Sequence, residues 1–166
     1  MRVLPALMIL ALALPAASPG EEPTLAETVA FIERSLLDDG REIYVSDNRI
    51  VAVHSDACRI GWTHAEIGNR FSGSVILAKE LNFADLDVSQ IKGWDSIGML
   101  RVVTYNSEPK IHIHSTRYYN NVLSQKDANV TQLELEFQDP RVAERVAKAF
   151  AHAARLCGAK QTKDPF

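Results

Sequence analysis

The sequence lacks the short motifs that mark common catalytic and nucleotide-binding sites. It has no Gly-x-Ser-x-Gly nucleophile elbow and no glycine-rich phosphate loop. Asp85 and Asp87 have a spacing found in calcium loops, but the glycine and the terminal glutamate of such a loop are missing. These absences favour a protein that is not an enzyme, and no cofactor is expected.

An excess of basic residues is also missing. The sequence has 18 basic and 21 acidic residues, and Arg2 is the one base before residue 21, so the remainder has 17 bases against 21 acids and a net charge of −4. This balance argues against a nucleic-acid partner. The stretch from Arg141 onward is the exception, with six bases against two acids. It could bind an acidic partner or the domain's own acids.

Long apolar runs are confined to the N-terminus. Arg2 precedes an apolar run from Val3 to Leu14, and small residues up to Gly20 follow it. A basic tip, a short apolar run and small residues are typical of a secretory signal peptide, whereas a membrane-spanning helix needs about 20 residues. We therefore expect residues 1–20 to be removed after Gly20, a secreted or periplasmic protein, and no stable membrane anchor. Residues 21–158 then form one domain, and 159–166 form a polar tail.

Cysteine is scarce, with Cys58 and Cys157 as the whole complement. An even pair in an oxidising compartment suggests a disulfide bond. Buried free thiols are also common, and Cys157 lies on the apolar face of an expected helix, with Cys58 expected on the inner face of a strand. The sequence leaves both interpretations open.

Two helices are expected, one near each end of the domain. Residues 24–38 carry a capping box at Thr24 and Glu27, followed by an apolar stripe of helical spacing, and Gly40 is a natural C-cap. Asp139 and Pro140 suit the start of a second helix, which Gly158 ends. The apolar stripe of this second helix comprises Val142, Val146, Ala149, Phe150, Ala153 and Cys157, and a basic stripe beside it comprises Arg141, Arg145, Lys148, His152 and Arg155.

About seven strands are expected between the helices, with short turns that favour antiparallel pairing. The clearest one is the stretch 132–138, in which Leu133, Leu135 and Phe137 alternate with polar residues. Other strands are expected at 43–45, 50–54, 58–63, 75–77, 97–105 and 111–113, with turns at Asp47-Asn48 and Asn120-Asn121.

The expected fold is therefore α+β: an N-terminal helix, a curled antiparallel sheet or barrel, and a C-terminal amphipathic helix that covers it. From Ile43 to Gly158 this element order resembles the pleckstrin-homology-like barrel, a family known for binding phosphoinositides and peptides. The ending from Asp139 to Gly158 also resembles uncharacterised secreted bacterial proteins. A lipocalin-like cup and a cystatin-like or cone-shaped sheet are the alternative folds.

His112 and His114 are the candidate metal ligands. Two residues apart on one strand, they point to the same face, as a strand-borne imidazole pair requires. A third ligand has to come from elsewhere, and His54 or His64 could supply it. The alternative is that both residues lie on a solvated face opposite Ile111.

A second candidate site follows directly along the chain. Arg117, Tyr118 and Tyr119 lie in a stretch rich in hydrogen-bonding and aromatic side chains, a mixture found at ligand rims and protein interfaces. The alternative is a polar strand end that runs into the turn at Asn120-Asn121.

Three hypotheses about function remain. The first is an exported, non-catalytic binding or interaction module, with a protein or a small ligand as its partner. The second is a metal-binding protein or metal-assisted enzyme that uses His112 and His114. The third is a small-ligand carrier with an apolar cavity, which Trp62, Phe71, Phe137 and Phe150 could instead fill.

Overall fold

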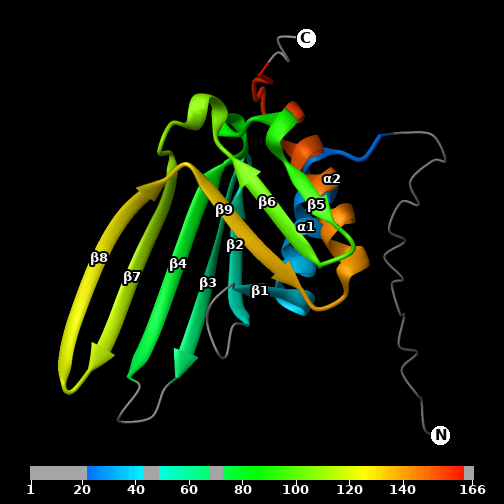
Figure 1. The fold of residues 1–166 in the computed structure, drawn as a ribbon. Coiled ribbons are helices and arrows are strands. Elements are labelled where there is room, and N and C mark those ends of the chain that lie inside the picture. Colours follow the sequence, from blue (N-terminus) through cyan, green and yellow to red (C-terminus); the bar gives the residue numbers. More distant parts are fainter. Residues whose placement is uncertain (1–21, 43–48, 68–72, 163–166) are drawn as a thin grey trace, which may run out of the picture.

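The computed structural model of the protein describes residues 22–42, 49–67 and 73–162 (Figure 1). Its two long helices flank all nine described strands in sequence, as the order of elements predicted. The helices are α1 (Leu25–Asp39) and α2 (Pro140–Leu156), and the strands are β1 (Gly40–Glu42), β2 (Ile50–Asp56), β3 (Arg59–Ile67), β4 (Ser74–Asn82), β5 (Lys92–Trp94), β6 (Met99–Val103), β7 (Ile111–Tyr119), β8 (Val122–Val130) and β9 (Gln132–Phe137). Short 3₁₀ turns cover Phe83–Asp85, Val88–Gln90 and Tyr105–Ser107.

The strands form two antiparallel sheets. One has the order β1-β9-β6-β5 and the other β2-β3-β4-β7-β8. Thr131 separates β8 from β9, so the chain passes there from the edge of the five-stranded sheet into the middle of the four-stranded one. Figure 1 shows this passage as an arch between the two sheets. The α+β class is confirmed.

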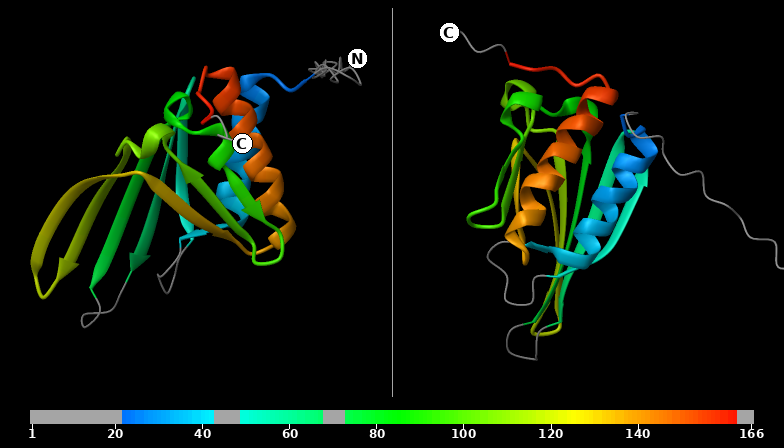
Figure 2. Two further views of the ribbon diagram at one scale, coloured as in Figure 1. Left: turned by 45° about the horizontal axis from the view of Figure 1, so that its top comes forward. Right: turned by 90° about the vertical axis from the view of Figure 1, so that its right-hand side faces the viewer.

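The helices lie side by side on one side of the molecule and run in opposite directions (Figure 2). Helix α2 packs against β5, β6 and β9, whereas α1 packs against β1 and β2. The β7–β8 edge of the five-stranded sheet lies on the opposite side, away from both helices (Figure 1). The described strands do not close into a barrel, so the pleckstrin-homology-like architecture is not confirmed.

The core fills the space between the helices and the two sheets. Phe83 and Phe150 meet there in an edge-to-face contact with ring centroids 5.5 Å apart. Trp62 and Phe137 are also fully buried, while Phe71 lies outside the described residues. Three of the four aromatic rings expected to fill the interior therefore do so.

Helix α1 begins and ends as its sequence indicates. Thr24 Oγ1 accepts a hydrogen bond from the Glu27 N–H at 3.3 Å, and the Thr24 N–H donates to the Glu27 carboxylate at 2.8 Å. These bonds confirm the capping box. Gly40 follows the helix in an extended rather than a left-handed conformation. A Cβ atom at this position would lie 2.6 Å from the Leu36 carbonyl oxygen, so close packing requires the glycine.

Helix α2 also begins at Pro140 after the Asp139 cap, as predicted. Its buried face is rotated slightly from the expected stripe, since Ala143, Ala147 and Ala154 are buried. Val142 and Ala149 are only half-buried. The buried residues are Ala143, Val146, Ala147, Phe150, Ala153 and Ala154.

Cys58 and Cys157 form a disulfide bond in the structure, with Cα atoms 5.8 Å apart. Cys58 lies in the turn between β2 and β3 rather than on a strand, and Cys157 caps α2. The bond therefore ties the end of the last helix to the five-stranded sheet.

The tail after α2 is held as far as Thr162. Asp87, which is buried, accepts hydrogen bonds from the N–H and the hydroxyl of Thr162. The expected strand at 43–45, the turn at Asp47-Asn48 and the expected signal peptide at 1–20 lie outside the described residues. Within the described ranges, neither helix is long and apolar enough to cross a membrane.

Candidate interaction surface on the β7–β8 arm

The residues that the sequence singled out lie together on the β7–β8 hairpin, which we call the arm (residues 111–130). Asn120 and Asn121 form its two-residue turn with φ of 50° and 62°, as the sequence predicted. All nine residues of β8 are exposed or half-buried. The arm therefore presents most of its surface to solvent.

Alternation along β7 divides the candidate residues between two faces. His112, His114 and Tyr118 lie on the outer face, which is the solvent side of the five-stranded sheet. Arg117 and Tyr119 lie on the inner face, the side that carries buried Ile111. The structure thus brings the two predicted sites onto one strand but does not merge them.

Large apolar side chains are exposed at the tip of the arm. Val122 and Leu123 are 64% and 61% exposed, and Tyr118 and Tyr119 are 48% and 46% exposed. Tyr118 lies opposite Leu123 on the outer face, and Tyr119 lies opposite Val122 on the inner face. Large exposed apolar side chains gathered at one hairpin tip are typical of an interaction surface.

The outer edge of β8 has no neighbouring strand in the part of the chain that the structure describes. β8 is the last strand of its sheet and pairs there with β7 alone. The other edges are shorter or covered, since β1 and β5 have three residues each and α1 packs against β2. A nine-residue free edge is a template for pairing with another strand.

The register of the hairpin predicts which backbone groups this edge offers. In a two-residue hairpin the residues flanking the turn, here Tyr119 and Val122, form a hydrogen-bonded pair, and such pairs alternate along the ladder. The N–H and C=O groups of every second residue of β8 therefore point away from β7. These residues are Leu123, Gln125, Asp127 and Asn129.

His112 and His114 converge on a carboxylate that the sequence analysis did not identify. One oxygen of Asp127, on β8, lies 2.8 Å from His114 Nδ1 and 3.3 Å from His112 Nε2. The other ring nitrogens contact Asn129 and Thr116 at 3.1 Å. The hydrogen bond from His114 holds the pKa of Asp127 below its usual range.

This cluster does not amount to a metal centre as it stands. No three His, Cys, Asp or Glu side chains among the described residues are placed to hold a metal ion. His64 is fully buried on the inner face, and β3 and β4 separate His54 from His112, so neither supplies the third ligand. Asp127 instead bridges the two imidazoles, and the metal site remains a prediction.

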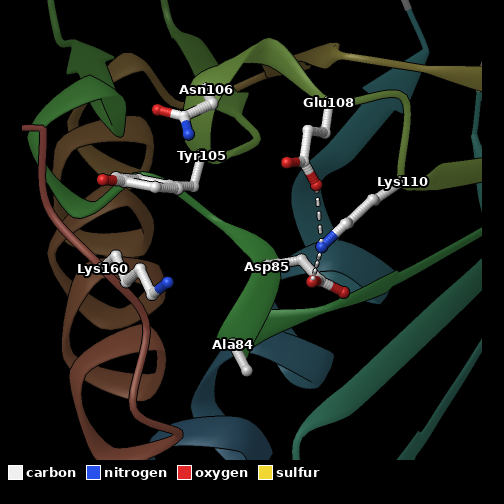
Figure 3. Close-up of a pocket in the computed structure, with 7 residues that line it drawn as sticks. All are labelled: Ala84, Asp85, Tyr105, Asn106, Glu108, Lys110 and Lys160. Atoms are coloured by element: carbon white, nitrogen blue, oxygen red, sulfur yellow. Dashed lines mark hydrogen bonds and ion pairs between the residues drawn. The ribbon is translucent and has the colours of Figure 1, made fainter.

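A polar pocket of about 180 Å³ is lined by Lys160 and by residues that follow β4 and precede β7, at the end of these strands away from the tip of the arm. Figure 3 shows its lining residues. Its two lysines already have partners. Lys110 Nζ lies 2.9 Å from Asp85 and 3.0 Å from Glu108, and these bonds raise the pKa of Lys110. Lys160 lies over the ring of Tyr105 at 5.5 Å. The pocket therefore offers a ligand little uncompensated charge.

The basic stripe of α2 is largely occupied within the molecule. Lys148 pairs with Glu144 at 2.7 Å, Arg141 pairs with Asp139 at 2.9 Å, and Arg145 lies over the Phe31 ring. His152 donates to the carbonyl of Pro23 at 2.7 Å. This surface is therefore a weaker candidate for binding an acidic partner than the arm.

No protein-family model, curated protein or solved structure matches the chain.

Proposed function

We propose that the protein is an exported, non-catalytic interaction module that binds an extended polypeptide segment as an added strand along β8. The observation that carries this proposal is the nine-residue free edge of β8, which ends in an exposed apolar tip. Strand addition uses both features at once. Backbone hydrogen bonds along the edge provide affinity, and side chains on alternate faces provide selectivity.

Two features support export. The expected signal peptide would direct the chain out of the cytoplasm. The disulfide between Cys58 and Cys157 suits an oxidising compartment, because cytosolic reductants keep most thiols reduced. If this is right, the protein recovered from the medium or the periplasm begins at Glu21, which N-terminal sequencing measures directly.

The test of strand addition distinguishes the contribution of the backbone N–H of Leu123 to binding from that of its side chain. Peptides are selected from a phage library of random dodecapeptides on the exported, oxidised protein. The affinity of these peptides for the parent protein is then compared with their affinity for the variants Leu123→Pro and Leu123→Ala. Proline removes a backbone N–H that points outward at an edge, where it is tolerated, whereas alanine removes the side chain and keeps that donor.

Selected peptides should bind Leu123→Pro at least tenfold more weakly than the parent protein and bind Leu123→Ala only a few-fold more weakly. Thermal unfolding of both variants checks that the hairpin remains folded. Peptides that bind the parent protein and Leu123→Pro equally well would show that the edge of β8 is not the binding site.

A further inference from the structure

We infer that the segment received by β8 alternates acidic with apolar side chains; this deepens the proposed function and rests on it. The inference comes from the chemistry of the two faces that border the free edge. A strand added to β8 directs successive side chains to the inner and the outer face in turn. Each face therefore selects every second residue of the partner.

The inner face beside the edge carries two cations, Arg117 and Lys126, which we call the cationic pair. Arg117 lies opposite Ser124, and Lys126 lies opposite Ser115. Arg117 and Lys126 are thus diagonal neighbours, about 7–8 Å apart between Cα atoms. Both residues are exposed. Their positive charges face the same stretch of solvent along the edge.

The cationic pair has no counter-charge among the described residues. No carboxylate in those ranges forms an ion pair with Arg117 or Lys126, whereas Arg101 and Lys148 lie 2.6 Å and 2.7 Å from theirs. The acid nearest along the chain, Asp127, points to the outer face and is engaged by His112 and His114. An added strand with acidic residues on its inner side would supply the missing charge.

The outer face beside the same stretch is apolar near the tip. Tyr118 and Leu123 lie opposite each other, and Ile76 on β4 lies on the same face one row away. All three side chains are exposed. Apolar side chains of an added strand would cover them, while its acidic side chains meet the cationic pair. One alternating segment therefore satisfies both faces.

The test uses three fluorescein-labelled octapeptides and fluorescence anisotropy. The first alternates glutamate with valine, the second alternates lysine with valine, and the third is the glutamate peptide with a central proline. The protein is the exported, oxidised chain, and two double variants accompany it. Arg117→Glu with Lys126→Glu reverses the cationic pair, and Lys92→Glu with Arg155→Glu makes the same change in net charge at exposed cations elsewhere.

The parent protein should bind the glutamate peptide about tenfold more tightly than the lysine peptide, the size expected for two exposed ion pairs, and raised salt should shrink this ratio. The reversed pair should invert the preference, whereas the control double variant should behave like the parent. The proline peptide should bind at least tenfold more weakly than the glutamate peptide. Because all four substituted residues are exposed, both double variants should melt close to the parent.

The outcomes separate this inference from the proposed function. Equal binding of the glutamate and lysine peptides, with sensitivity to Leu123→Pro retained, would overturn the inference and leave strand addition standing. A glutamate preference that ignores both Leu123→Pro and the central proline would overturn strand addition, because charge alone would then hold the peptide. A dimer of the chain that the glutamate peptide does not dissociate would also overturn the inference, because a second copy would then occupy the edge.

Discussion

At both ends of the β7–β8 hairpin, side chains alternate between the inner and the outer face, but one end is buried and the other is exposed. At the start of β7, Ile111 is 1% exposed because the core covers the inner face there. At the other end, Tyr119 projects from the same face and is nearly half exposed, with Gly73 beside its ring. Burial at the first end stabilises the fold, while the apolar side chains at the second contribute little to folding and remain free to bind.

The largest expected effect lies at the core end, in the disulfide. Replacing Cys58 and Cys157 together with alanine should lower the free energy of unfolding by up to about 4–5 kcal/mol, the chain-entropy value for so long a loop. Chemical denaturation of the oxidised parent and the double variant measures this loss. An unchanged midpoint would mean that the bond is absent in the native protein.

A matched pair of aromatic truncations compares the core with the exposed tip of the arm. Phe150→Ala should cost about 3–5 kcal/mol, because it empties a fully buried site against Phe83. Tyr118→Ala should cost less than about 1 kcal/mol, because the residue is already about half exposed. Denaturant unfolding of both variants tests the contrast. Similar losses would contradict the separation of a core end from a binding end.

Replacing Asp87 should lower the free energy of unfolding by an intermediate amount. Burial by itself would raise the pKa of Asp87, but the hydrogen bonds from Ser89 and Thr162 outweigh it and hold the pKa below the ordinary value of 3.8. Asp87→Ala should cost about 1–3 kcal/mol, because it leaves these donors without an acceptor. It should also expose the bond after Lys160 to trypsin, which limited proteolysis detects.

The lowered pKa of Asp87 fixes the sign of the pH dependence. A carboxyl group that is more acidic in the folded state stabilises the protein fully above about pH 3.8 and loses that contribution as the pH falls through its folded pKa. The stability difference between the parent protein and Asp87→Asn should therefore shrink below about pH 4. A difference that stays constant down to pH 2 would contradict the assignment.

The smallest expected effect concerns zinc at His112 and His114. Because Asp127 bridges both rings, one equivalent of zinc should leave the melting temperature unchanged, and elemental analysis should find less than one zinc per chain. A rise of several degrees that disappears in His112→Ala would instead establish the predicted metal site and make it the leading functional candidate.

Local signals in the sequence were sufficient to predict where both helices begin. The Thr24–Glu27 capping box and the Asp139-Pro140 start act within one turn of the chain, so the residues themselves reveal them. The turn at Asn120-Asn121 was predictable for the same reason, since both residues tolerate positive φ.

The free edge was not predictable from the sequence. The stretch 122–130 has no apolar alternation, because of its nine residues only Val130 is an apolar residue packed against the core, and no strand was expected there. The pairing of Asp127 with His112 and His114 depends on the hairpin register, so side chains 13 to 15 residues apart meet only after folding. The turn itself sets that register, and it would have suggested Asp127 once β8 was assigned as a strand.

Residue-resolved amide hydrogen exchange of the arm, with and without the alternating glutamate peptide, tests the account most directly. In the free protein the outward amides of Leu123, Gln125 and Asp127 should exchange faster than those of Val122 and Ser124, which bond to β7. A saturating amount of peptide should protect the outward set and leave the inward set unchanged. Protection that appears only around Lys110 and Lys160, or nowhere in β8, would contradict strand addition at this edge.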